Sequence, residues 1–154
     1  MKNGQKKLSC LLAAFLLAGF TAVSAETATG KYNFSNGNDM EKLELTNEWD
    51  KVFPQSDKVN HRKVTFRNRY GVTLAADLYV PKNATGKLAA IAVSGPFGAV
   101  KEQASGLYAQ TLAERGFLTI AFDPSFTGES GGQPRYVASP DINTEDFCAA
   151  VDYL

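Results

Sequence analysis

One pentapeptide of the chain fits a pattern known from nucleophilic catalysis. Residues 128–132 read Gly-Glu-Ser-Gly-Gly and match G-x-S-x-G, in which a serine nucleophile occupies a sharp turn between a strand and a helix. That geometry requires the strand to enter the turn directly and the helix to leave it directly. Here five residues separate the apolar run ending at Phe122 from Gly128, and Pro134 follows the glycines. We therefore interpret Ser130 as a loop serine and not as a nucleophile.

The other candidates for acid–base or metal chemistry are few. His61 is the only histidine, and its place before the first predicted strand favours a surface residue over a catalytic base. Asp123 directly follows an apolar run, where an aspartate either orients a loop or bonds its own backbone. No metal site is expected, because one histidine, one cysteine of the mature chain and scattered carboxylates lack the spacing of metal ligands.

Two apolar runs, Leu88–Val93 and Phe117–Phe122, predict strands of a central sheet. Neither run alternates, which is typical of strands buried on both faces in a parallel arrangement. Between them an apolar stripe at helical spacing predicts a helix that Gly116 ends in the left-handed conformation. The stripe consists of Ala104, Leu107, Tyr108, Thr111 and Leu112. The turn 94–98 (Ser-Gly-Pro-Phe-Gly) then lies at the carboxyl end of a strand, where α/β sheets bind their ligands.

Further elements are predicted on both sides of this βαβ unit. Val64–Arg67 and Val72–Val80 predict two strands of a hairpin at the sheet edge. Met40–Phe53 has loosely helical apolar spacing and predicts a short helix that Pro54 ends.

The last predicted element is a helix that begins with Asn143 as its cap and Asp146 three residues later. Its apolar stripe consists of Phe147, Ala150, Val151 and Leu154. Because the sequence stops inside this stripe, with no following strand, we expect it to be the first part of a longer protein.

The N-terminal segment has the composition of a targeting signal. Three lysines precede the uncharged apolar run Leu11–Phe20, and the small residues Val23–Ala25 offer a cleavage site, so residues 1–25 are predicted to be a secretory signal peptide. A membrane anchor is the alternative, which the shortness of the run disfavours, because a helix needs about 20 apolar residues to span a bilayer. Residues 26–48 are predicted to be a flexible lead-in, and residues 49–154 the folded part.

Charge and cysteine content exclude other classes. Without the three signal lysines the chain has 13 basic and 16 acidic residues and no basic cluster, so nucleic acid is not an expected partner. Cys148 is the one cysteine after the signal, so no intrachain disulfide can form. Its place on an apolar helix face favours a buried, structural thiol.

Several blocks together resemble a known family. These are residues 49–54 (WDKVFP), 64–66 (VTF), 68–71 (NRYG), 95–103 (GPFGAVKEQ), 122–125 (FDPS) and 128–132 (GESGG). In this order they resemble bacterial α/β-hydrolases of the dienelactone-hydrolase-like and X-prolyl-peptidase-like branch, over residues 49–154. The resemblance implies the N-terminal half of an α/β-hydrolase fold, with an antiparallel first hairpin followed by parallel strands and flanking helices.

The resemblance also implies where the catalytic groups lie. The serine or cysteine nucleophile, the acid and the histidine of the family all follow the position of Leu154 and are not contained in this chain. The part present is the oxyanion turn, where the backbone amide of Phe97 or its neighbour Gly98 would donate to the developing negative charge. Some relatives carry a tyrosine hydroxyl at the position of Phe97, which a phenylalanine cannot replace. The alternative is an ordinary turn between a strand and a helix.

We therefore predict an exported, periplasmic or secreted hydrolase of ester, amide or related acyl bonds in small molecules or peptides, without a cofactor. One alternative is a non-catalytic or truncated hydrolase-like domain that binds a ligand or partner. The other is a nucleotide-binding βαβ protein, which is disfavoured because G-x-G-x-x-G is absent and Pro96 has no amide proton.

The signal peptide gives a first testable prediction. Protein isolated from its native host should begin at Glu26, because the peptidase that removes such signals cuts after a small residue such as Ala25. Mass spectrometry of the intact protein measures this directly. An intact N-terminus retained in the membrane would contradict the prediction.

Overall fold

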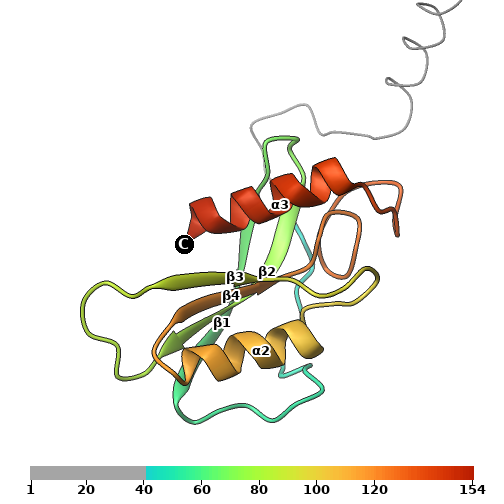
Figure 1. The fold of residues 1–154 in the computed structure, drawn as a ribbon. Coiled ribbons are helices and arrows are strands. Elements are labelled where there is room, and N and C mark those ends of the chain that lie inside the picture. Colours follow the sequence, from blue (N-terminus) through green and yellow to red (C-terminus); the bar gives the residue numbers. More distant parts are fainter. Residues whose placement is uncertain (1–40) are drawn as a thin grey trace, which may run out of the picture. The chain divides into compact units, whose positions relative to one another are not determined.

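The computed structural model describes residues 41–154, so the predicted signal peptide and most of the predicted lead-in lie outside the described residues. The elements are β1 (Val59–Arg67), β2 (Thr73–Pro81), β3 (Ala90–Val93), α2 (Ala104–Ala113), β4 (Leu118–Phe122) and α3 (Pro140–Tyr153). The four strands form one sheet in the order β1-β2-β4-β3, and α2 and α3 cover its opposite faces (Figure 1). Strands β1, β2 and β4 pair antiparallel, whereas β3 and β4 pair parallel. The predicted α/β class, with an antiparallel hairpin and parallel later strands, is confirmed.

The hairpin of β1 and β2 is longer than predicted. Its turn is the expected one, with Gly71 at φ +84° and the amide of Asn68 bonded to the carbonyl of Val72. Strand β1, however, starts at Val59 and not at Val64. Residues 59–63 lack an apolar alternation because two of their inward side chains, those of His61 and Lys63, are charged or polar and pair with carboxylates.

The core consists of one layer on each face of the sheet. Toward α3 it contains Phe66, Val72, Leu74, Ala76, Leu78, Ile120, Phe122, Ala149 and Ala150. Toward α2 it contains Val59, Tyr79, Ala109, Ala113 and Ala121. Strand β2 is buried almost throughout because it lies between two other strands and under both layers. Strand β3 is an edge in the described chain, and its residues are half-buried or exposed, unlike the predicted fully buried strand.

Helix α2 presents a different face to the sheet than its apolar stripe predicts. Leu107 and Tyr108 are 46% and 67% exposed, and the buried residues are Ser105, Gly106, Ala109, Gln110 and Ala113. The first turn of the helix has little free space on this side, because a Cβ added to Gly106 would lie 2.2 Å from the carbonyl oxygen of Lys101, in the loop before the helix, and 3.1 Å from the Phe53 ring. Apart from Gln110, the buried side of the helix consists of small residues, and the larger apolar ones face outward. The predicted end of the helix is confirmed, with Gly116 at φ +100°.

Helix α3 begins three residues before the predicted cap. It starts at Pro140 with Ser139 in the N-cap position, and Asn143 lies inside the helix. Its buried side chains are Ile142, Glu145, Asp146, Ala149 and Ala150, whereas Phe147, Cys148 and Val151 are exposed. The prediction that Cys148 is buried is therefore wrong. The helix turns a small and acidic face inward because two of its carboxylates bond the turn and loop residues beneath it.

Residues 41–58 are irregular, and the helix predicted for Met40–Phe53 is not present over residues 41–53. Trp49 and Phe53 hold this segment in place, since the indole nitrogen donates to the Phe53 carbonyl at 2.7 Å and their rings meet edge to face. Across residues 41–154 we find no helix with the length and apolar content that crossing a membrane requires.

Gly106 gives a prediction about packing. Gly106→Ala in the full-length protein should destabilise the fold by about 1–3 kcal/mol, because the added methyl group overpacks the contact with the Lys101 carbonyl. An alanine in a helix is ordinarily more favourable than a glycine. The sign of the change in the free energy of unfolding therefore separates the effect of packing from that of helix propensity. Urea unfolding checks it, with Tyr108→Ala on the exposed side of the same helix as control. A stabilised Gly106→Ala protein would contradict the packing described here.

Candidate active site at the carboxyl edge of the sheet

The turn after β3 presents two backbone amides to the surface. The amide of Ala99 donates to the Pro96 carbonyl at 3.0 Å, and a positive φ at Gly98 (+82°) but not at Phe97 is the pattern of a type II turn. Among the described residues, neither the amide of Phe97 nor that of Gly98 donates a hydrogen bond. The Phe97 side chain is 77% exposed. The predicted oxyanion turn is therefore an open backbone turn at the carboxyl end of a strand, with donors available to a ligand.

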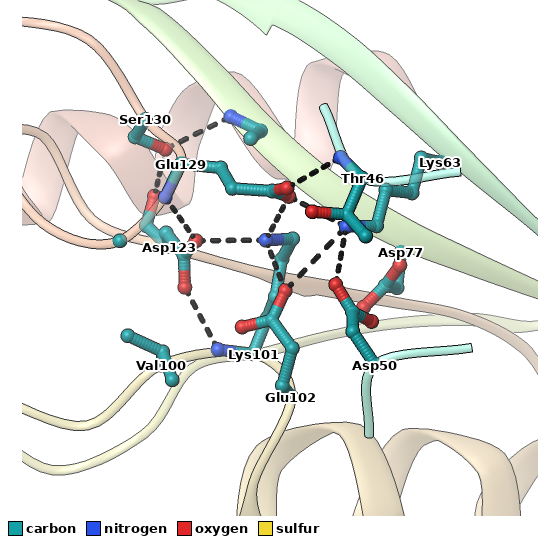
Figure 2. A network of polar contacts seen from close by, with 12 residues as sticks. Thr46, Asp50, Lys63, Asp77, Val100, Lys101, Glu102, Asp123, Glu129 and Ser130 are labelled. Carbon is teal, nitrogen blue, oxygen red and sulfur yellow. Dashed lines mark hydrogen bonds and ion pairs between the residues drawn. The ribbon is translucent and has the colours of Figure 1, made fainter. Parts of the chain in front are cut away.

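A buried carboxylate fastens this turn to the loop after β4. The Asp123 side chain accepts from the backbone amide of Lys101 at 2.7 Å and from its ammonium group at 2.9 Å, and both side chains are fully buried (Figure 2). The amide of Asp123 in turn donates to the Ala75 carbonyl of β2 at 3.0 Å. Of the two readings of Asp123, the structure supports the one in which it orients a loop.

Glu129, next to Asp123 and Lys101, also connects several segments of the chain. One of its oxygens, Oε2, lies 2.7 Å from the ammonium groups of both Lys63 and Lys101, and Oε1 accepts from the Thr46 amide at 2.8 Å. Its own amide donates to Asp123 at 2.9 Å. Glu129 thus joins the irregular N-terminal segment, strand β1, the loop after β3 and the loop after β4 (Figure 2).

The ion pairs continue from Lys63 to the sheet interior. Asp50 bonds the ammonium groups of Lys51 at 2.6 Å and Lys63 at 2.8 Å. Lys51 also lies 3.1 Å from Asp77 Oδ2, an ion pair without hydrogen-bond alignment. The His61 ring nitrogen Nε2 lies 2.7 Å from the other oxygen of Asp77. His61 is therefore not the predicted surface histidine: it lies inside β1, its side chain is 13% exposed, and its partner is a buried carboxylate.

The lysines control the protonation of these carboxylates. Burial alone would raise the pKa of Asp50, but hydrogen bonds from Lys51 and Lys63 outweigh it and lower the pKa to about 2. The pKa of Glu129 is also lowered to about 2, because the bonds from Lys101, Lys63 and the Thr46 amide exceed the effect of burial. Burial raises the pKa of Glu102 despite its contact with Lys101. The charges of Asp123 and its acidic neighbours raise the pKa of Lys101 against the opposing effect of burial.

Three of the acidic residues lie close enough together to suggest a cation site. Ligand oxygens of Asp50, Glu102 and Glu129 all lie within 4.8 Å of one another. The ammonium groups of Lys63 and Lys101, however, lie among them at hydrogen-bond distance. Because two ammonium groups already neutralise these carboxylates, we assign no metal site to the cluster.

Ser130 has no strand-to-helix turn around it. It lies in the loop after β4, and its buried hydroxyl donates to the Asp123 carbonyl at 2.7 Å and accepts from the Ala75 amide at 2.8 Å. The backbone carbonyls of Ser130 itself and of Gly128 accept from the Arg135 guanidinium. The hydroxyl thus has the contacts of a loop serine, as the spacing predicts.

A separate polar cluster supports the start of the same loop from the other face. Asp146 of α3 accepts from the amide and the hydroxyl of Ser125, both at 2.8 Å, and from the Asn68 side chain at 2.7 Å. The side-chain oxygen Oδ1 of Asn68 accepts from the Val72 amide at 2.9 Å, which closes the hairpin turn. Helix α3 is therefore anchored to the carboxyl edge of β4 by a buried carboxylate and not by its apolar stripe alone.

Sequence reasoning found the turn and Asp123 but not the charged residues that hold them. Those residues are Asp50, Lys51, Lys63, Asp77, Lys101, Glu102 and Glu129. Five of them, Asp50, Lys51, Lys101, Glu102 and Glu129, fall in the blocks that carry the family resemblance, and that is the one signal available. Charged residues usually indicate a solvated surface, so their burial could not be read from residue type.

A mixed sheet in this strand order, with helices on both faces and an open turn after the third strand, defines an α/β-hydrolase fold. A solved structure of the α/β hydrolase GrgF from Penicillium sp. sh18 is similar, with a TM-score of 0.54 and 28% identity over 61% of this chain and 32% of that one. More specifically, the chain belongs to the X-Pro dipeptidyl-peptidase (S15) family, whose sequence profile matches residues 70–154.

Two bacterial relatives are more similar in sequence. The uncharacterized protein PA2218 of Pseudomonas aeruginosa is 66% identical over 145 residues, which are 94% of this chain and 38% of that protein. Its crystal structure has a TM-score of 0.72, with 76% identity over 73% of this chain and 36% of that chain. The uncharacterized protein YcjY of Escherichia coli is 48% identical over 98 residues, 61% of this chain and 32% of that protein. The chain thus spans between about a third and two fifths of the length of these relatives.

The lowered carboxylate pKa values predict an acid-sensitive contribution to stability. Asp50 has a pKa of about 2 in the folded protein and about 3.9 when unfolded, so its contribution is fully present above about pH 5 and is lost as the pH falls toward 2. Asp50→Asn should destabilise the full-length protein at pH 7, and the difference from the unsubstituted protein should shrink between pH 5 and 2. Thermal unfolding at several pH values measures it, with the exposed Glu44→Gln as control. A difference that does not change with pH would show that the charge of Asp50 contributes nothing.

Proposed function

We propose that the protein to which this chain belongs is a hydrolase of ester, amide or related acyl bonds, and that the turn 96–99 supplies a backbone donor to its oxyanion hole. The observation that carries the proposal is the pair of unengaged amides at Phe97 and Gly98, on a type II turn at the carboxyl end of β3. Membership of the S15 family and the α/β-hydrolase fold support the reaction class.

The chemistry follows from where charge develops. When a nucleophile attacks an acyl carbonyl, the carbonyl oxygen becomes an oxyanion, and donors that are already oriented stabilise it without reorganisation. The turn is held by the buried pair of Lys101 and Asp123, so its amides keep their direction while the charge changes. The Phe97 ring has no donor, so the backbone alone provides the hydrogen bonds here.

The groups that attack and transfer protons are proposed to lie beyond Leu154. The chain spans only part of its relatives. Among the described residues, the Ser130 hydroxyl bonds two backbone groups and no base, and the polar partner of His61 is Asp77 and not a serine or cysteine. We assign the serine or cysteine nucleophile, the acid and the histidine to that following part. The non-catalytic alternative predicts that the full-length protein binds acyl compounds without turning them over.

The proposed substrates are small-molecule or peptide acyl compounds. A relative from Aspergillus aculeatus, named thiohydrolase aneE, is 31% identical over 99 residues, which are 64% of this chain and 30% of that protein, and its name is consistent with hydrolytic chemistry. Export to the periplasm or medium is proposed from residues 1–25, which lie outside the described residues.

Phe97 provides a test of the oxyanion assignment. Phe97→Pro removes one amide proton at the second position of a type II turn, where proline is well accommodated. We expect kcat for a p-nitrophenyl ester to fall by about 10² to 10³, the usual loss for one oxyanion donor. Phe97→Ala keeps the amide and should change kcat by less than about tenfold. Full activity of Phe97→Pro would exclude the Phe97 amide and leave Gly98 as the donor of this turn.

Ser130 provides the opposing test. Ser130→Ala in the full-length protein should lower kcat by less than about tenfold, whereas loss of an acyl-transfer nucleophile costs several orders of magnitude. It should also destabilise the protein by about 1–3 kcal/mol, because the buried Ala75 amide loses its acceptor. Kinetics well below the melting temperature separate the two effects. A folded Ser130→Ala protein without any acylation would make Ser130 the nucleophile.

A further inference from the structure

The Gly-Glu-Ser-Gly-Gly block at 128–132 has no catalytic part in the proposed function, yet each of its first four residues makes a specific contact. A Cβ on Gly128 would lie 2.2 Å from Asp123 Oδ2, so only glycine lets the backbone approach this carboxylate. The Ser130 hydroxyl links Asp123 to β2, and the Gly131 amide donates to the Thr73 carbonyl at 2.8 Å. The block therefore packs against the carboxylate that holds Lys101.

The side chain of Glu129 connects this block to three other segments of the chain. Its carboxylate accepts from Thr46, Lys63 and Lys101, which belong to three different segments of the chain. Two ammonium groups converge on the single oxygen Oε2, and they repel each other across it. The negative charge of Glu129 offsets this repulsion, together with Asp50 at Lys63 and with Asp123 and Glu102 at Lys101.

We propose that Glu129 is a positioning residue for the oxyanion turn, acting through Lys101. This inference rests on the proposed function and adds a role for a residue outside the turn. Glu129 and Asp123 together fix the Lys101 ammonium, and Asp123 also binds the Lys101 backbone amide, so side chain and main chain are held at one place.

The segment between Lys101 and the turn is short and has little conformational freedom. Only Val100 separates Lys101 from Ala99, whose amide closes the turn. At the other end of the loop, a Cβ on Gly95 would lie 2.9 Å from the Ala99 side chain, so the loop is packed against itself. A displacement of Lys101 therefore moves the amides of Phe97 and Gly98.

We expect Lys101 to be displaced in this way when Glu129 loses its charge. The Lys101 side chain is fully buried and cannot reach water in place of the lost partner. The two ammonium groups would repel each other with less compensation, and Lys101 would relax toward Asp123 and Glu102. A misplacement of about 1 Å is enough to cost up to about 10² in rate when the displaced group faces the reacting atoms.

The test compares two isosteric changes in the full-length protein. Glu129→Gln should lower kcat for a p-nitrophenyl ester by about 10- to 100-fold with KM changed by less than about threefold, because the turn acts on the transition state. Glu145→Gln is the matched control: Glu145 of α3 also pairs with a cation, but among the described residues its hydrogen bonds and ion pair all involve Arg69 and none involves the loop after β3. It should lower stability without lowering kcat.

A second readout keeps the inference separate from the proposed function. Amide hydrogen exchange of a peptide covering 94–101 should quicken in Glu129→Gln and stay unchanged in Glu145→Gln, whether or not the protein hydrolyses esters. Absence of any hydrolysis by the unsubstituted protein would refute the proposed function, with the exchange result still testing the positioning role. If Glu129→Gln does not fold, Glu129→Asp, which keeps the charge, should show the same changes more weakly. Unchanged kcat and unchanged exchange in a folded Glu129 variant would overturn the inference.

Discussion

A carboxylate without solvent contact, that of Asp123, determines how the loops at the carboxyl edge of the sheet are arranged. Burying a charge is strongly unfavourable unless it is paired and hydrogen-bonded. Asp123 meets this requirement by binding both the backbone and the ammonium group of Lys101, and Lys101 in turn requires Glu129 and Glu102. The turn after β3 and the loop after β4 are brought together because Asp123 and Lys101 are both fully buried and bond each other. The geometry of the turn after β3 is thus a consequence of the burial of the charges of Asp123 and Lys101.

The sequence could predict the sheet, since its apolar runs and turn residues follow simple rules. The strands around Gly71 and Gly116 and the turn containing Gly98 were found in this way. The buried face of α2 was not, because apolar periodicity identifies large residues, whereas close packing there uses Gly106 and Ala109. The stripe predicted for α3 is right in part: Ala150 is buried and Leu154 packs against the core, whereas Phe147 and Val151 are exposed. The site was predictable only in part for a different reason. Its charged residues come from five separate segments, and their burial depends on pairings that no local pattern contains.

The contacts of residues 128–132 also explain why the serine motif is present. The G-x-S-x-G spacing at 128–132 is satisfied by packing needs: glycine for close approach to Asp123, glutamate for two lysines, and serine for a bridge between β2 and β4. A short motif is therefore weak as a sign of nucleophilic catalysis until a strand and a helix are seen on either side of it. In this chain residues 128–132 instead contact Asp123 and Lys101, which hold the turn after β3.

In the proposed reaction the backbone turn 96–99 faces the developing oxyanion of an acyl substrate. The most direct measurement is a crystal structure of the full-length protein inactivated by an alkyl phosphonate, whose oxygen takes the place of the oxyanion. We expect this oxygen to accept a hydrogen bond from the amide of Phe97 or Gly98, at about 2.7–3.1 Å, with the phosphorus bonded to a residue beyond Leu154. A phosphonate oxygen bound by other donors, or phosphorus bonded to Ser130, would contradict it.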